Sequence, residues 1–217
     1  MPARPPGQPR GDQCWATFLK NHATAILACD FFLAVTATFR MLYVFVVIEH
    51  STRRLAHINV TANPSADWAL QQLREVVGNG GGHRYLIHDR DQIFAKHLDD
   101  SIQALGVQVL RSLIASPKAN AICERVIGTT RRECLDWLIP MSEAHLRAIL
   151  KSWVEHYNGG RPHSALGPGV PDPPKKHAGV PKLKQRHGLA VDALVLVKSV
   201  LGGLHHEYSL GQVPSSS

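Results

Sequence analysis

Three acidic residues stand where a carboxylate could take part in chemistry. Asp30 follows the apolar run AILAC, Asp89 follows the apolar run YLIH, and Glu124 lies near the start of a segment with helical spacing. A single acid in such a place more often caps a helix or faces water, so the function has to come from the three together. A charge at the end of a buried run is costly without a partner, and a shared site would supply one.

A site that gathers three carboxylates needs cations, because like charges at short distance repel each other. Magnesium prefers oxygen ligands, uses few carboxylates and completes its shell with water and substrate phosphates. Two such ions about 3.5–4 Å apart can activate an attacking oxygen and stabilise the leaving oxygen at a phosphodiester. We therefore predict that Asp30, Asp89 and Glu124 hold two Mg²⁺ or Mn²⁺ ions for phosphodiester chemistry.

The elements that must position these acids follow the order β-β-β-α-β-α-β-α-α. Three consecutive strands followed by alternating helices and strands imply an α/β fold, a five-stranded mixed sheet covered by helices. Ser65 can cap the first helix, and Ser116-Pro117 is a good start for the third. The strands are expected at 24–32, 41–50, 53–61, 84–89 and 107–112, and the helices at 65–78, 93–106, 116–138 and 142–157.

The third of these helices can present Glu124 on one face. Successive residues turn by about 100°, so Ile122 and Val126 lie about 160° from Glu124 and can face the core. Glu133 lies on the opposite side and is expected to be solvated or ion-paired. Gly128 would let a bulky ligand approach, and Arg131 would suit a DNA phosphate. Within roughly 40° of Glu124 lie Asn120, Gly128, Arg131 and Leu135.

Four stretches of the chain, in this order, resemble the DDE-type insertion-sequence transposases that are related to retroviral integrases. The stretches are ILACDFF, RYLIHDRDQIF, SPKANAICERVIGTTRREC and WVEHYNGGRPHSALG. The 58 residues between Asp30 and Asp89 and the 34 between Asp89 and Glu124 fit the acid spacings of that family. Its N-A-x-x-E-R helix, with a basic residue seven places after the glutamate, matches 120–125 and Arg131.

The resemblance implies an RNase H-like fold with Asp30, Asp89 and Glu124 as catalytic and metal-binding residues. It also implies Mg²⁺- or Mn²⁺-dependent cleavage of DNA at transposon ends, then strand transfer by the freed 3′-hydroxyl, in a homo-oligomer on DNA. Tyr157, Arg161 and His163 could contact phosphate or fix their loop onto the core, and the structural role is favoured. The predicted DNA contacts are Lys118, Asn120, Arg125, Arg131, Arg132, Arg161 and His163.

Asp91 competes with Asp89 for the role of ligand, because on a strand the two side chains would point the same way. The spacing to Glu124 and the aromatic Phe94 five places on both select Asp89. Asp91 is expected in a turn or at a helix cap.

Composition bounds the remaining possibilities. The chain has 217 residues with 44% hydrophobic and 19% charged, which is enough for one domain with a packed core. A net charge of +7 favours a nucleic-acid partner, although a merely basic protein has the same balance.

The four cysteines form no C-x-x-C pair and are expected to be buried thiols. Without a long apolar run or a signal sequence, we expect a cytoplasmic protein with no membrane contact.

The predicted division is a disordered lead at 1–13, the catalytic core at 14–166, and a Pro/Gly-rich linker with a small β extension at 167–217. Within the extension, LGGL favours a tight turn between two short strands. Relatives usually carry a helix-turn-helix region ahead of the core, whereas only about 20 residues that look disordered precede the first strand here. A separate helix-turn-helix protein, a misassigned start or a truncated element would each explain this.

Two alternatives remain for the function, and a third fails. An inactive or truncated remnant with the same fold would bind nucleic acid without catalysis. The DRD sequence could instead be the metal-binding D-x-D of a sugar-nucleotide glycosyltransferase, although that motif is a weak signal. A calcium loop of the EF-hand type fails, because Ile93 stands at the fifth position and no glycine follows it.

Overall fold

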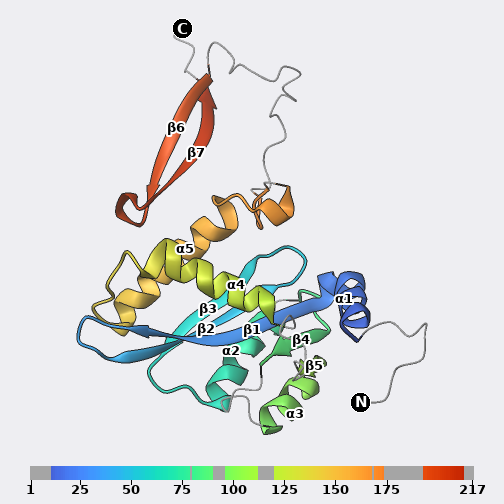
Figure 1. Ribbon diagram of the computed structural model, residues 1–217. Helices are drawn as coiled ribbons and strands as arrows, with labels where there is room; N and C mark the ends of the chain where they lie inside the picture. The colour runs from blue at the N-terminus through green and yellow to red at the C-terminus, as the bar shows by residue number, and fades with distance from the viewer. Residues whose placement is uncertain are drawn as a thin grey trace, which may run out of the picture. The chain divides into compact units, whose positions relative to one another are not determined.

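The computed structural model describes residues 11–78, 80–89, 96–111, 120–167, 169–173 and 193–212 (Figure 1). The chain divides into two compact units, Met1–Glu143 and Ala144–Ser217, which are described separately below. The predicted boundary after residue 166 stays a prediction. No helix in these described ranges is both long enough and apolar enough to cross a membrane.

The first unit is built on a five-stranded mixed sheet, as predicted. The strand order is β3-β2-β1-β4-β5, with β1, β2 and β3 antiparallel and β4 and β5 parallel to β1. Tight turns suffice for the antiparallel strands, whereas each parallel strand needs a helical crossover. The strands are β1 (Ile26–Val35), β2 (Met41–Glu49), β3 (Leu55–Thr61), β4 (Tyr85–His88) and β5 (Gln108–Arg111).

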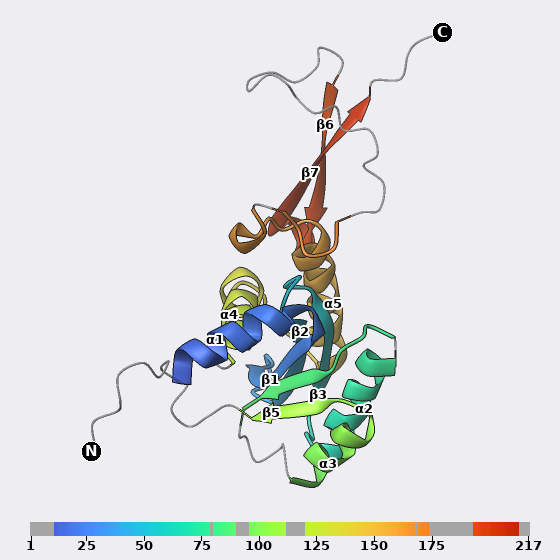
Figure 2. The same ribbon diagram turned by 90° about the vertical axis from the view of Figure 1, so that its right-hand side faces the viewer.

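Helices cover both faces of this sheet (Figure 2). The crossover helices α2 (Ala66–Gly78) and α3 (Lys96–Ala104) lie on one face, and α1 (Gly11–His22) and α4 (Ala121–Thr130) lie on the other. The alternation of side chains along a strand decides which residue meets which layer. Thus Leu27 and Cys29 of β1 join the core cluster with α2 and α3, while Asp30 turns toward α4.

Local signals place the crossover helices where the sequence predicts them. The Ser65 hydroxyl accepts a hydrogen bond from the Trp68 backbone N–H at 3.2 Å, which satisfies a donor in the first turn of α2. After α3 the chain turns at Gly106 with a φ of +81°, a conformation that suits glycine because it has no Cβ. Both helices are confirmed within the described residues.

Two predictions about helices need correction. The N-terminal segment is not wholly disordered, because α1 occupies Gly11–His22. Phe18 of this helix packs edge-on against Tyr85 of β4 at 5.2 Å, a tertiary contact that composition does not reveal. The helix predicted over 116–138 also ends earlier. Its predicted start lies outside the described residues, and α4 continues into a wider turn, η2 (Arg131–Leu135), that ends at Leu135.

The second unit begins with α5 (Glu143–Gly159) and ends with an antiparallel ribbon. The ribbon consists of β6 (Ala193–Val200) and β7 (His205–Gln212), joined by the short turn η4 (Leu201–Gly203). Gly202 and Gly203 both have positive φ, so the predicted LGGL turn is confirmed. A hydrogen bond of 2.9 Å between His156 of α5 and Glu207 of β7 links helix and ribbon.

Candidate active site

Asp30 of β1 and Asp89, the first residue after β4, lie beyond the last paired residues of two neighbouring parallel strands. Ala28 of β1 pairs with Ile87 of β4, and two residues further along each strand come Asp30 and Asp89. Directly paired residues face the same side of a sheet, so the two carboxylates are directed to the face that carries α4. Asp30 is half-buried within β1, and Asp89 is exposed just past the end of β4.

Asn120 ties the start of α4 to the acid in β1. Its side-chain amide donates to Oδ2 of Asp30 at 3.3 Å and to the Cys29 carbonyl oxygen at 3.3 Å. The backbone N–H of Phe31 donates to the other oxygen of Asp30 at 2.8 Å. These neutral donors orient the Asp30 carboxylate while leaving its charge in place. Asn120 is only 5% exposed, so a direct DNA contact by this residue stays a prediction.

Glu124 lies in the first turn of α4, one turn after Asn120, and is exposed. The neighbouring Cys123 packs inward and is fully buried. Burial raises the pKa of the Cys123 thiol well above its ordinary value, and Cys29 and the negative charges of Asp30 and Glu124 raise it further. The two acids therefore act on the same small region between α4 and β1.

The inner face of α4 follows the angular prediction in part. Val126 is buried as expected, whereas Ile122 is only half-buried. The buried side chains instead run along Cys123, Val126 and Thr130, and the helix continues to the buried Cys134. Burial raises the pKa of Cys134 to about 12. Cys29, Cys123 and Cys134 are all free thiols, which confirms the prediction for the cysteines whose side chains are described.

The donor set of the predicted metal site is chemically suitable for a divalent cation. Two aspartates and a glutamate provide hard oxygen ligands, and the buried Oδ1 of Asn120 has no hydrogen-bond partner in the structure. Within the described part of the chain, however, no three His, Cys, Asp or Glu side chains lie close enough together to hold one ion. Asp30 thus lies in β1, Asp89 directly after β4, and Glu124 on the covering helix α4.

Two of the predicted basic residues pack along α4 and η2. Arg131 donates to the Leu33 carbonyl oxygen at 3.1 Å, and its guanidinium carbon lies 5.5 Å from the centre of the Phe32 ring. Gly128 was expected to leave room for a ligand, but a Cβ there would stand 3.0 Å from a terminal nitrogen of Arg132. A flexible arginine therefore occupies the space next to the glycine.

The remaining predicted DNA contacts are placed as follows. Arg125 is exposed on α4, and Lys118 lies outside the described residues. In the second unit, His163 is 8% exposed, and its ring nitrogen Nε2 lies 3.1 Å from the Tyr157 carbonyl oxygen. The guanidinium of Arg161 lies 5.9 Å from the Tyr157 ring centre. These contacts support the loop-fixing role for Tyr157, Arg161 and His163.

A residue that the sequence did not single out contacts His88, the residue before Asp89. Asp99 of α3 is 4% exposed, and its carboxylate lies 3.0 Å from Nε2 of His88. The buried neighbours Leu98 and Ile102 mark the inner face of α3. An acid next to such an apolar stripe could have indicated a buried, paired carboxylate in the sequence. Its partner His88 could be identified only from the packing of β4 against α3.

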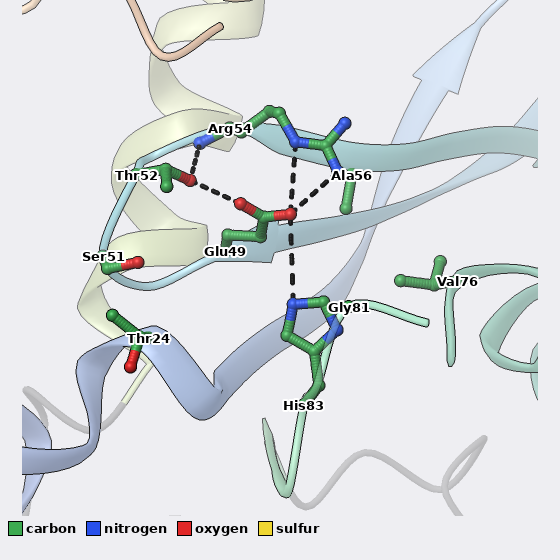
Figure 3. Close-up of a pocket in the computed structure, with 9 residues that line it drawn as sticks. All are labelled: Thr24, Glu49, Ser51, Thr52, Arg54, Ala56, Val76, Gly81 and His83. Carbon is green, nitrogen blue, oxygen red and sulfur yellow. Dashed lines mark hydrogen bonds and ion pairs between the residues drawn. The ribbon is translucent and has the colours of Figure 1, made fainter. Parts of the chain in front are cut away.

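A second polar region surrounds Glu49 at the other end of β1 and β4 (Figure 3). Glu49 accepts hydrogen bonds from the Arg54 guanidinium at 2.8 Å and from the Thr52 hydroxyl at 2.6 Å. Burial tends to raise the pKa of Glu49, but the hydrogen bonds and the charge of Arg54 outweigh it and leave this pKa below its ordinary value. The pocket has a volume of about 300 Å³ and is lined by Thr24, Glu49, Ser51, Thr52, Arg54, Ala56, Val76, Gly81 and His83.

Known proteins resemble the chain in both sequence and fold. Residues 105–171 match the family described as the integrase core domain. An insertion element IS407 uncharacterized 31.7 kDa protein of Burkholderia multivorans is 28% identical over 144 residues, covering 65% of this chain and 51% of that protein. An insertion element IS476 uncharacterized 39.2 kDa protein of Xanthomonas euvesicatoria is 27% identical over 141 residues, covering 64% of this chain and 40% of that protein.

The chain is thus similar in sequence to the integrase core domain family and to proteins of insertion elements. The predicted resemblance to DDE-type transposases is therefore confirmed. The chain spans about half the length of the first of these relatives and less of the second.

Solved structures confirm the RNase H-like fold of this chain. The catalytic domain of Mos1 mariner transposase has a TM-score of 0.54 at 14% identity, covering 70% of this chain and 85% of that one. The HTLV-2 integrase catalytic core domain in complex with magnesium has a TM-score of 0.50 at 9% identity, covering 63% and 87%. At such identities the likeness shows the fold alone.

Proposed function

We propose that this chain is the catalytic core of a DNA transposase that cleaves the phosphodiesters at transposon ends and joins the freed 3′-hydroxyls to target DNA. The observation that carries this proposal is the parallel register of β1 and β4, in which Ala28 pairs with Ile87, so that Asp30 and Asp89 each lie two residues beyond a paired position. The anchor between Asn120 and Asp30 holds the start of α4, the helix of Glu124, beside the first of these acids. We infer that the three acids share the face of the sheet that carries α4.

Asp30, Asp89 and Glu124 would hold Mg²⁺ or Mn²⁺, two ions in the active complex. When bound, such ions supply charge for an in-line displacement at phosphorus, by activating the attacking oxygen and stabilising the leaving one. The magnesium complex of the HTLV-2 integrase core supports this choice of cation. The chain itself contributes acceptor-only carboxylates, and the amides around Asp30 fix their direction.

The basic residues around α4 would bind the DNA backbone. Arg125, Arg131 and Arg132 are exposed on the same helix and its extension. Arginines of this kind position DNA through phosphate oxygens without reading its sequence. The net charge of +7 supports the same partner. We propose a homo-oligomer on DNA in the cytoplasm, with the recognition of transposon ends supplied by a helix-turn-helix region or protein.

A metal-dependent nicking assay on supercoiled plasmid tests this function without knowledge of the transposon ends. Nicking is expected with Mg²⁺ or Mn²⁺ and not with EDTA. Asp89→Asn and Glu124→Gln should each lower the nicking rate at least about 10³-fold, which corresponds to about 4 kcal/mol of transition-state stabilisation. Asp91→Asn is the matched control and should stay within about threefold of the unmodified chain. Equal activity of Asp89→Asn and the unmodified chain would sink the proposal.

The inactive remnant remains the second candidate, and one observation favours it. The three acids do not form a closed cluster in the described residues. A remnant would bind DNA in a salt-dependent manner and would show no nicking with either cation. The sugar-nucleotide alternative predicts binding of a sugar nucleotide in calorimetry, which the transposase function does not.

A further inference from the structure

The ring of His88 is fully enclosed between two elements. His88 is the last residue of β4 and is 1% exposed. Its side chain has the same direction as that of Leu86, toward α2 and α3, because residues two apart on a strand share a face. Asp89 follows immediately and is directed to the other face. The imidazole is thus hidden on one side of the sheet, while the proposed metal ligand beside it is exposed on the other.

Both ring nitrogens of His88 face oxygen atoms. Nδ1 lies 2.7 Å from the backbone carbonyl oxygen of Asp89. Nε2 lies 3.0 Å from Oδ1 of Asp99 on α3. A carbonyl oxygen can only accept, so Nδ1 carries the hydrogen of the first bond. The second contact, to the Asp99 carboxyl group, holds the other side of the ring in place.

The carbonyl that His88 holds belongs to the first residue after β4. The paired residues of β4 end at His88, so Asp89 lies past the end of the ladder. The position of the Asp89 carbonyl oxygen depends on both backbone angles of Asp89, and one of them, φ, also sets how its side chain leaves the strand. A buried hydrogen bond at this carbonyl therefore restricts the orientation of the exposed carboxylate.

We propose that His88 and Asp99 form a buried dyad that positions Asp89 for metal binding. This inference rests on the proposed function, because it concerns the orientation of a proposed metal ligand. Asp99 acts through His88, and His88 acts through the backbone of Asp89, so both are positioning residues. The dyad also explains a buried acid on the inner face of α3, where an unpartnered carboxylate would be costly.

A matched pair of substitutions separates positioning from simple structural support. Asparagine at position 88 can place its amide nitrogen near the Nδ1 position and keep the bond to the Asp89 carbonyl, but it does not reach Asp99. Glutamine can place its amide near the Nε2 position and keep the bond to Asp99, but it leaves the Asp89 carbonyl without this donor. If the dyad positions Asp89, His88→Gln should weaken Mn²⁺ binding, measured by electron paramagnetic resonance, by about 10–100-fold.

His88→Asn should keep Mn²⁺ affinity within about threefold of the unmodified chain, even if it melts at a lower temperature. The turnover number for plasmid nicking should follow the Mn²⁺ affinity, whereas the affinity for DNA should stay constant in both variants. If the pair of His88 and Asp99 only stabilises the fold, His88→Gln should bind Mn²⁺ better than His88→Asn, because His88→Gln retains the buried link between β4 and α3. Equal Mn²⁺ affinity of His88→Gln and the unmodified chain overturns the inference.

The Asp99 variants carry the test if a His88 variant does not fold. Asp99→Asn can still form a hydrogen bond with Nε2 and keep the ring in place, so Mn²⁺ affinity should stay within about threefold. Asp99→Ala loses this hydrogen bond and should weaken Mn²⁺ binding by about tenfold or more. The exposed neighbour Asp100 provides the control, since Asp100→Asn should change nothing.

The variant Asp89→Asn keeps this inference separate from the proposed function. Loss of Mn²⁺ binding in Asp89→Asn together with normal binding in His88→Gln and Asp99→Ala rejects only the dyad. Normal Mn²⁺ binding and nicking in Asp89→Asn reject the proposed function itself.

Discussion

The acids near the two ends of the parallel strand pair β1 and β4 have different hydrogen-bond partners. Beside the start of β1, Glu49 of β2 is paired with the guanidinium of Arg54 and the hydroxyl of Thr52. Further along β1, Asp30 accepts hydrogen bonds from the backbone N–H of Phe31 and the side-chain amide of Asn120. Both acids are fixed in direction, the first by a guanidinium and a hydroxyl and the second by two amide donors.

This difference separates an acid that stabilises the fold from one that is suited to bind a cation. A guanidinium neutralises a carboxylate and uses its lone pairs, so Glu49 has little left for an external ion. Amide donors orient a carboxylate and leave its charge in place, which suits Asp30 for a metal. We therefore expect substitutions of Asp30 to lower metal-dependent nicking and substitutions of Glu49 to lower the stability of the fold.

The largest effect is expected for Asp30→Asn. The loss of one proposed metal ligand should lower metal-dependent nicking at least about 10³-fold, because the charge that holds the cation is removed. The melting temperature should change little, since asparagine can still accept from the Phe31 N–H. Nicking rates and thermal melts of the same preparation check this. Nicking that survives in Asp30→Asn would mean that the two acids do not differ in function.

A smaller effect is expected for Asn120→Ala. The anchor between α4 and Asp30 is lost, and nicking should fall by about 10–100-fold. Asn59→Ala is the matched control, because the amide of Asn59 bonds Gln72 at 2.6 Å on β3, away from the acids. That variant should lose stability and keep its rate per folded molecule. If both variants lowered the rate equally, the anchor would have no specific role.

Glu49→Gln should affect stability and not chemistry. It weakens the bonds from Arg54 and Thr52, and the free energy of unfolding should fall by about 1–3 kcal/mol. Urea unfolding followed by circular dichroism measures this. Glu75→Gln is the control, because Glu75 is half exposed and lies 3.9 Å from His57, a type of contact that contributes little. A loss of nicking per folded Glu49→Gln molecule would contradict the assignment of the two ends.

The smallest effect concerns pH and the histidines near the Glu49 pocket. Burial lowers the pKa of His50 and His83 below the ordinary value, with a further contribution from Arg53 at His50 and with Glu49 opposing it at His83. The unfolded chain therefore binds protons at these residues more readily than the folded one. Stability should be highest above the unfolded pKa of about 6.5 and should fall as the pH decreases below it.

Unfolding measured between pH 7 and pH 5 checks this expectation. The double variant His50→Gln/His83→Gln should show a flatter dependence, and the exposed His206→Gln should keep the original slope. The lowered pKa of Glu49 has its own window, because the stability from that carboxylate is lost only at lower pH, as it becomes protonated. If stability depended on pH equally steeply in the double variant, the two histidines would not be the cause of the lower stability at acidic pH.

Most of the fold followed from local patterns. The apolar runs predicted all five strands of the sheet, and the cap at Ser65 and the glycine at 106 predicted helix boundaries. Two features depended on distant contacts and were not predicted. The helix α1 packs through Phe18 onto Tyr85, and α4 ends in the wide turn η2 rather than running to residue 138.

The members of the candidate site stay a prediction from the sequence, whereas their hydrogen-bond partners came only from the structure. Residue type and spacing selected Asp30, Asp89 and Glu124, and in the register of β1 and β4 the first two each lie two residues beyond the pair Ala28 and Ile87. Asp30 is bonded by Asn120, which lies 90 positions further along the chain. His88, the residue before Asp89, is bonded to Asp99 of α3, on the opposite face of the sheet from α4. Such contacts exist only once the strands and helices are packed.

The sequence by itself determined the chemistry available to this protein, namely three oxygen-ligand acids in a basic chain with the motifs of an integrase core. Only the tertiary structure decided how each acid is held. Local sequence sets side-chain alternation and helix phase, whereas the hydrogen bonds of Asn120 to Asp30 and of His88 to Asp99 depend on which elements become neighbours. These packed neighbours distinguish Glu49, which is bound by a guanidinium, from Asp30, which is bound by a backbone N–H and a side-chain amide.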